Sequence, residues 1–201
     1  MDKKEYYRKC KTPSTWFFAG RQMYNAADIL FDIWTYSINK PIPRMRYTPT
    51  CEELNTCEEQ LMKSCDLFPV YMMLMGYALE NLSKGLALME RTKPGGDLVD
   101  CSNLTIKDLG FGDHNTLKRL DWLEISLSQE EQEAVEITDD HVIWAGKYGV
   151  PKSPGQHKAS EDMPTSIAEW RKYADALQPL FDRLYKEYRE RAFLYFGLIL
   201  G

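Results

Sequence analysis

The sequence predicts an all-α protein, a helical bundle of about five main helices that pack mostly antiparallel. Apolar residues recur at steps of three and four along several long segments, and prolines and glycines separate these segments. A run of alternating polar and apolar residues, the pattern of a half-buried strand, is missing. The 201 residues, 44% hydrophobic and 27% charged, suit one domain. We expect that domain at residues 14–201, after a basic N-terminal arm at residues 1–13.

The first predicted helix begins after Pro13, with Ser14 as its N-cap. It ends near Asn39, because Pro41 cannot continue a helix. Its apolar stripe consists of Trp16, Ala19, Met23, Ala27, Leu30 and Trp34. Residues 51–64 predict a short exposed helix after it.

The segment 67–89 is the most apolar part of the chain. Apolar residues cover most of its circumference, which predicts a central helix with neighbours on several sides. Gly76 and Gly85 each cost about 1 kcal/mol relative to alanine inside a helix, so we expect close approach of another helix there. The run from Lys93 to Gly96, Lys-Pro-Gly-Gly, ends this helix.

Two shorter helices are expected next. Asp113 is the expected N-cap of a helix from His114 to about Ile125. Ser128 and Glu131 have the spacing of a capping box, which predicts the start of a further helix. Its apolar stripe consists of Ala134, Ile137, His141, Trp144 and Tyr148.

The last predicted helix begins near Asp162 and has the longest stripe. Pro179 predicts a kink in it, because proline removes one helical hydrogen bond. The apolar positions are Ile167, Trp170, Ala174, Leu177, Phe181, Leu184, Tyr188 and Tyr195.

Charge and composition exclude several classes of protein. Twenty-five basic against 30 acidic residues argue against a surface that coats nucleic acid, so RNA is a possible partner that the net charge does not support. The first residues lead into no apolar signal core, and no apolar run reaches the length of a membrane span. We therefore expect a cytoplasmic protein without membrane contact. Five cysteines, an odd number, argue against a closed disulfide framework.

Glu80 and Lys84 are the first candidate site residues, because they lie four apart in the most apolar helix. They form either an ion pair that fixes the helix register or part of a functional polar pocket. Tyr77 and Asn81 lie beside them on nearly the same face. His114, at the start of its helix, either binds a loop carbonyl or points into a cleft.

Three further features have both a structural and a functional interpretation. Trp144, Lys147 and Tyr148 either stack on a base or planar ligand or close one end of the bundle. His141 lies on an apolar stripe and is expected to be a core histidine, whereas His157 lies in a polar loop. The acidic run 121–140 is expected to form a solvated helix face.

The motifs of several enzyme classes are missing from the sequence. The histidines and cysteines lack the spacings of zinc and di-iron sites, so no metal is expected. Glycine-rich phosphate loops and the Gly-x-Ser-x-Gly motif are also missing, so no cofactor is expected.

Four segments together resemble uncharacterised bacterial proteins of the HEPN-like superfamily (higher eukaryotes and prokaryotes nucleotide-binding). They are Gly76-Tyr-Ala-Leu-Glu80-Asn-Leu-x-Lys84-Gly85, His114-Asn115-x-Leu117, Trp144-Ala-Gly-Lys147-Tyr148-x-Val-Pro151 and Trp16-x-x-Ala19-Gly20-Arg21. The similarity spans roughly residues 14–190. It implies a helical bundle, often a homodimer, that acts in toxin–antitoxin, phage-defence or RNA-processing systems.

The ribonucleases of that superfamily carry an arginine followed by four to six residues and a histidine. No arginine stands in that window before His114, His141 or His157. We therefore expect a non-catalytic interaction module with a cognate antitoxin or nucleotidyltransferase as possible partner. Two alternatives remain open. One is an RNA-processing or nucleotide-binding protein with a divergent site on Glu80, Lys84 and His114, with Asn115 as a further ligand-binding candidate. The other is a helical bundle that binds a small ligand between Trp144 and Tyr148.

Overall fold

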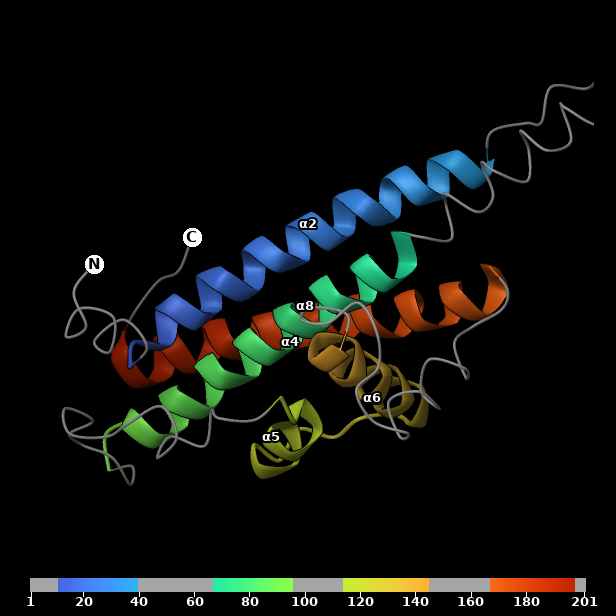
Figure 1. Ribbon diagram of the computed structural model, residues 1–201. Helices are drawn as coiled ribbons and strands as arrows, with labels where there is room; N and C mark the ends of the chain where they lie inside the picture. Colours follow the sequence, from blue (N-terminus) through green and yellow to red (C-terminus); the bar gives the residue numbers. More distant parts are fainter. Residues whose placement is uncertain (1–10, 40–66, 96–113, 145–166, 198–201) are drawn as a thin grey trace, which may run out of the picture.

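The computed structural model describes residues 11–39, 67–95, 114–144 and 167–197, and in these ranges the chain forms five helices and no strand. In chain order the helices are α2 (Pro13–Asn39), α4 (Leu67–Thr92), α5 (Thr116–Trp122), α6 (Gln129–Trp144) and α8 (Ile167–Phe196). Figure 1 shows three long helices, α2, α4 and α8, with α5 and α6 on one side of them. The predicted all-α bundle is confirmed.

Helix α4 is the centre of the bundle, because it contacts each of the other four helices. Met72, Met75, Leu79, Leu82 and Leu86, all on α4, are fully buried. The predicted central helix is therefore confirmed, and it extends three residues beyond Met89, to Thr92.

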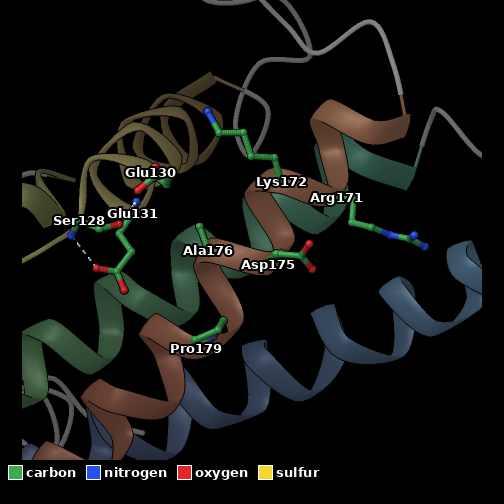
Figure 2. Close-up of a pocket in the computed structure, with 8 residues that line it drawn as sticks. All are labelled: Ser128, Glu130, Glu131, Arg171, Lys172, Asp175, Ala176 and Pro179. Atoms are coloured by element: carbon green, nitrogen blue, oxygen red, sulfur yellow. Dashed lines mark hydrogen bonds between the residues drawn. The ribbon is translucent and has the colours of Figure 1, made fainter.

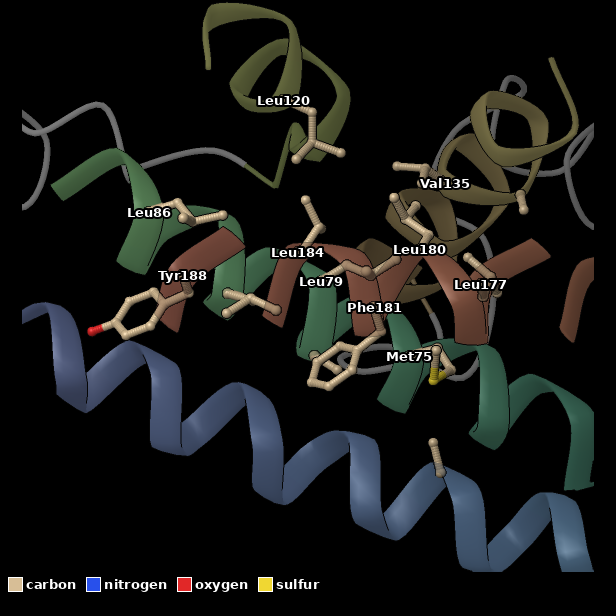
Figure 3. Packing of buried hydrophobic residues seen from close by; sticks show 14 of the residues in the cluster. Met75, Leu79, Leu86, Leu120, Val135, Leu177, Leu180, Phe181, Leu184 and Tyr188 are labelled. Carbon is tan, nitrogen blue, oxygen red and sulfur yellow. The ribbon is translucent and has the colours of Figure 1, made fainter. Parts of the chain in front are cut away.

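Aromatic side chains fill the space between α2 and α8. Phe17 of α2 stacks on Tyr188 of α8 with ring centroids 4.3 Å apart, and Tyr24 stacks on Phe181 at 4.0 Å. These contacts pair the start of α2 with the end of α8, so the two helices run antiparallel, whereas α4 and α8 run in the same direction (Figure 1). Figure 3 shows leucines of α4 and α8 meeting in the same core. Five residues of the predicted α8 stripe are buried: Ala174, Leu177, Phe181, Leu184 and Tyr188.

Small residues allow the helices to approach α4 closely. A Cβ atom at Gly76 would come within 2.8 Å of the Thr138 carbonyl oxygen of α6. A Cβ atom at Gly85 would lie 3.2 Å from the Pro13 carbonyl oxygen of α2. The predicted close approach at both glycines is therefore confirmed. Gly20 of α2, which the sequence did not single out for this reason, is packed equally closely, 3.0 Å from the Ala78 carbonyl oxygen.

The first helix differs from its prediction at its start and on its buried side. It begins at Pro13 rather than after it, because proline has no N–H to leave unpaired in the first turn. Phe17 is buried although it lies outside the predicted stripe, whereas Trp16 is only half-buried. The stacking of Phe17 on Tyr188 turns this face of α2 toward α8.

The predictions for α5 need correction, and those for the start of α6 are confirmed. The N-cap of α5 is Asn115, whose Oδ1 accepts a hydrogen bond of 2.8 Å from the Lys118 amide, and the helix ends at Trp122 rather than near Ile125. Glu124 follows it with φ of 59°, a left-handed conformation that a continuing helix excludes.

At α6, the Ser128 Oγ accepts from the Glu131 amide and the Glu131 carboxylate accepts from the Ser128 amide, the reciprocal pair of a capping box.

Several predicted features lie outside the described residues. They are most of the basic arm 1–13, the helix 51–64, the cap at Asp113, the helix start near Asp162, and Lys147, Tyr148 and His157. Pro179 lies inside α8, which continues on both sides of it. Within the described ranges, every helix is too short or too polar to cross a membrane.

Candidate functional site: a polar junction of α4, α5 and α6

The carboxylate of Glu80, in the middle of α4, is the centre of a buried polar cluster. Glu80 is 4% exposed, and each of its two oxygens has a partner. Oε1 accepts from the Lys84 ammonium, one helical turn further along α4. Oε2 lies 3.0 Å from Nδ1 of His114, which directly precedes the N-cap of α5. Helix α4 and the chain entering α5 are therefore joined through one carboxylate.

Lys84 is held from two sides. Its ammonium binds Glu80 and also lies 5.2 Å from the centre of the Trp16 ring on α2, where a cation–π contact stabilises it. Burial alone would raise the pKa of Glu80, but the charge of Lys84 and the hydrogen bonds from His114 and Lys84 outweigh burial and hold this pKa below its usual value. Glu80 is therefore ionised at neutral pH.

Arg119 forms a second contact between α5 and α4. Its side chain is 7% exposed, and Nε donates a hydrogen bond of 3.2 Å to Oγ of Ser83. Ser83 Oγ in turn donates to the backbone carbonyl of Glu80 at 2.9 Å. His114, which precedes α5, and Arg119, in the middle of it, thus attach this part of the chain to the same stretch of α4.

Asp139 of α6 holds the start of α5 from the other side. Its Oδ2 accepts a hydrogen bond of 2.7 Å from the Thr116 amide, the first residue of α5. Burial raises the pKa of Asp139 to about 6, and the negative charge of Glu80 adds to this, although the Thr116 hydrogen bond and the charge of Arg119 oppose it. The start of α5 therefore lies between a carboxylate of α4 and a carboxylate of α6.

The structure brings some of the predicted site residues together and separates others. Glu80 lies within hydrogen-bonding distance of both Lys84 and His114. Asn81 donates to the Tyr77 carbonyl at 2.7 Å, a bond within one helix, and Asn115 is the exposed N-cap of α5. The last three candidates cannot be assigned to the cluster, because Lys147, Tyr148 and the side chain of Trp144 lie outside the described residues.

The expectation for His141 is confirmed, and that for the acidic run is wrong at one residue. His141 is buried, and its Nδ1 lies 2.7 Å from the Ile137 carbonyl, so the ring is hydrogen-bonded inside the core. Burial lowers the pKa of His141 and favours its neutral form. In the run 121–140, Glu130 and Glu136 are exposed as expected, but Asp139 faces inward because it binds the Thr116 amide.

An open groove of about 840 Å³ lies between the start of α6 and the first half of α8 (Figure 2). It shares no residue with the Glu80 cluster. Acidic and basic side chains both line it, and two of them are paired with residues beside the groove, Glu131 with Arg183 and Lys172 with Glu133. Its lining residues are Ser128, Glu130, Glu131, Arg171, Lys172, Asp175, Ala176 and Pro179.

Sequence reasoning did not include Ser83, Thr116, Arg119 and Asp139 in the site. A signal existed for Ser83 and Arg119. Ser83 lies between Glu80 and Lys84 in the sequence, and Arg119 follows His114 by five residues. The arginine of the ribonuclease motif precedes its histidine, whereas Arg119 follows His114. No local pattern pointed to Asp139, because its partner is 23 residues away.

Comparison of the chain with models of protein families, with curated proteins and with solved structures finds no match in any of the three. The resemblance to the HEPN-like superfamily therefore stays a prediction. In the described ranges, His, Cys, Asp and Glu side chains do not gather in groups of three or more that could hold a metal ion.

Proposed function

We propose that this protein is a helical interaction module that forms a homodimer and acts in a bacterial defence, stress or RNA-linked system. The observation that carries the proposal is a group of exposed apolar side chains at the end of α8. Leu194 is 74% exposed and Phe193 58%, and Phe196 of the same turn is also exposed. Exposed apolar clusters of this kind are typical of protein-binding surfaces.

A side chain of α2 belongs to the same end of the bundle. Phe18 is exposed, and its ring makes an edge contact of 5.4 Å with Phe17, which itself stacks on Tyr188 of α8. The start of α2 and the end of α8 lie next to each other in Figure 1. In the proposed homodimer, a second copy of the chain covers both.

The polar cluster supports a structural role for Glu80 and Lys84. Both oxygens of Glu80 are bound inside the protein, and the Lys84 ammonium is enclosed by Glu80 and Trp16. Groups bound in this way hold α4, α5 and α2 in place. The resemblance to the HEPN-like superfamily supports a role in a bacterial defence, stress or RNA-linked system.

Light scattering of the purified protein tests the dimer. We expect the mass of two chains, and we expect Leu194→Ser combined with Phe193→Ser to give one chain. Ile29→Ser is the matched control, because Ile29 is similarly exposed but lies in the second half of α2. A wild-type protein that stays monomeric at high concentration would contradict the proposal.

A second candidate function, RNA processing or nucleotide binding, is favoured by one observation. The His114 side chain is 30% exposed, while the buried Glu80 carboxylate orients its ring through Nδ1. A carboxylate that orients an imidazole in this way leaves Nε2 for proton transfer to a ligand.

An RNA-degradation assay together with a nucleotide-binding assay tests this candidate. If the candidate is right, we expect RNA cleavage or nucleotide binding by the wild type and a large loss of this activity in His114→Ala and Lys84→Ala. We expect no loss of activity in His141→Ala, since His141 is enclosed in the core. Because substitutions in the cluster also affect folding, circular dichroism of each variant must match the wild type. Wild-type protein without cleavage or binding would rule the candidate out.

A further inference from the structure

Four aspartates form an acidic seam where α2 faces α8, namely Asp28 and Asp32 of α2 and Asp175 and Asp182 of α8. Asp28 accepts a hydrogen bond of 3.3 Å from Nε2 of Gln178, which joins the two helices. Burial and the negative charges of Asp32 and Asp182 raise the pKa of Asp28. Among the described residues, no basic side chain forms an ion pair with any of the four carboxylates. The seam is therefore rich in negative charge that no described cation neutralises at close range.

The hydroxyl of Tyr71, on α4, is buried beside this seam without a partner. Tyr71 is 4% exposed, and its oxygen makes no hydrogen bond. Its ring centroid lies 5.7 Å from that of Phe31 on α2. Burial and the charges of Tyr24, Asp28 and Asp175 raise the pKa of Tyr71, so carboxylates of both helices lie near its hydroxyl. A buried hydroxyl without a hydrogen bond is costly, and this one is placed where a cation between the two carboxylates would meet it.

Aromatic rings lie beside the carboxylates of the seam. Tyr24 precedes Asp28 by one turn of α2, and its ring stacks on Phe181 of α8 with centroids 4.0 Å apart. Phe31 follows Asp28 by three residues, so it lies on the same side of α2, against Tyr71. Such rings attract cations to their faces and pack against alkyl chains. The seam therefore offers apolar as well as acidic contacts.

The carboxylates of the seam are accessible from solvent. Asp32, Asp175 and Asp182 are exposed, whereas Asp28 is half-buried. Figure 2 shows Asp175 on the side of α8 that points away from Glu130. A ligand therefore reaches the acidic side chains from outside the bundle.

The spacing of the carboxylates favours a long organic cation over a metal ion. In the described part of the chain, acidic side chains do not gather in groups of three that could hold a metal. Asp175 and Asp182 are separated by two turns of α8, which corresponds to about 10 Å along the helix. A ligand that pairs with both needs positive charges separated by an apolar chain. Aliphatic polyamines, in which alkyl segments join ammonium groups, have this chemistry.

We propose that the acidic seam is a binding site for an aliphatic polyamine. Its ammonium groups pair with Asp28, Asp175 and Asp182, and the group between Asp28 and Asp175 also donates a hydrogen bond to the Tyr71 oxygen. Its alkyl segments lie against the ring of Tyr24. The site is independent of the proposed dimer, because the exposed apolar side chains of the dimer surface lie at the end of α8, whereas Asp175 lies in its first half.

Calorimetric titration of the full-length protein with spermidine tests the site. An ionic strength of about 0.15 M screens diffuse attraction between exposed charges. We expect the wild type to bind one spermidine per chain. Tyr71→Phe removes only the hydroxyl and should weaken binding about tenfold or more, as the loss of a hydrogen bond to a charged group does. Asp28→Asn keeps the size of the side chain but removes its charge, and should weaken binding at least as much.

Matched controls separate this site from a general attraction of cations. Asp121→Asn makes the same change of charge at an exposed aspartate of α5, which packs against α4 and α6, and should alter the affinity little. Mg²⁺ is the second probe and should bind more weakly than spermidine. If circular dichroism shows that Asp28→Asn does not fold, Asp175→Asn, at an exposed position, takes its place.

Three results would overturn the site. Wild-type protein that does not bind spermidine would do so, even if a lysine-rich peptide binds. An unchanged affinity in Tyr71→Phe would mean that the hydroxyl takes no part in binding. Equal losses in Asp28→Asn and Asp121→Asn, or Mg²⁺ bound as tightly as spermidine, would show diffuse attraction to an acidic surface.

Discussion

The two sides of α4 are attached to their neighbours by different forces. Toward α2 and α8, apolar and aromatic side chains such as Leu79, Leu82 and Phe181 meet in a close-packed core, and the polar contacts on this side are peripheral, as where Arg191 of α8 donates to Glu90 near the end of α4. Toward α5, Leu120 also joins the core, but two polar contacts are added, Glu80 with His114 and Ser83 with Arg119. Burial of apolar surface is not directional, whereas a buried ion needs a particular partner atom. On the apolar side, substitutions should therefore lower the free energy of unfolding in proportion to the apolar surface they remove. On the side of α5, the free energy of unfolding should depend on individual polar atoms and on pH.

The largest expected effect is that of Lys84→Met, which keeps the size of the side chain but leaves Glu80 buried without its cation. We expect a loss of about 3–5 kcal/mol in the free energy of unfolding, measured by urea denaturation at neutral pH. Lys186→Met is the matched control. Lys186 also pairs with a glutamate four residues away, but its side chain is 76% exposed, so we expect a loss below about 1 kcal/mol. Equal losses in the two variants would contradict the distinction between the two sides of α4.

On the apolar side, Leu79→Ala should cost about 2–5 kcal/mol, because Leu79 is fully buried. The same urea titration, repeated in mild acid, distinguishes the apolar side of α4 from its polar side by the pH dependence of the loss in stability. The loss in Leu79→Ala should not change with pH. The loss in Lys84→Met should shrink in acid, because Glu80, which then has lost the Lys84 cation, can take up a proton. A similar pH dependence in both variants would show that Glu80 is not a buried charge.

A smaller effect is expected where α6 crosses α4. Gly76→Ala places a methyl group within 2.8 Å of the Thr138 carbonyl oxygen, so one helix must shift at a cost of about 1–3 kcal/mol. The gain of about 1 kcal/mol in helix propensity offsets part of this cost. A thermal melt that shows Gly76→Ala to be more stable than the wild type would mean that the two helices are less closely packed.

The smallest effect concerns a helix end that lies away from both sides of α4. Ser128→Ala removes the acceptor for the Glu131 amide and should cost about 1 kcal/mol in the free energy of unfolding. Gln132→Ala, at an exposed position one turn further, is the control and should change stability little. Equal losses in both would remove the capping box as an explanation.

The apolar side of α4 was largely predictable from the sequence, because its signal is local. The apolar residues around most of the circumference of the 67–89 segment predicted a central helix, and Gly76 and Gly85 predicted the close contacts. Phe17 was missed because its neighbour Trp16, at the edge of the predicted stripe, is also apolar. Stacking on Tyr188 of α8, far along the chain, determines which of the two is buried.

The polar side was predictable only in part. Glu80 and Lys84 stand out as ions in an apolar helix, and His114 was placed near them as a candidate. The contributions of Arg119 and Asp139 depend on how α5 lies between α4 and α6, and local periodicity carries no information on that. The acidic surroundings of Asp139 even favoured the wrong interpretation, a solvated face.

A double-mutant cycle on Glu80 and His114 tests most directly whether the polar cluster joins α5 to α4. The free energies of unfolding of Glu80→Gln, His114→Gln and the double variant are compared with the wild type at a slightly acidic pH. A hydrogen bond between charged groups predicts a coupling of about 1.5–3 kcal/mol. Losses that add to within about 0.5 kcal/mol would show that the two residues act independently and would contradict the junction.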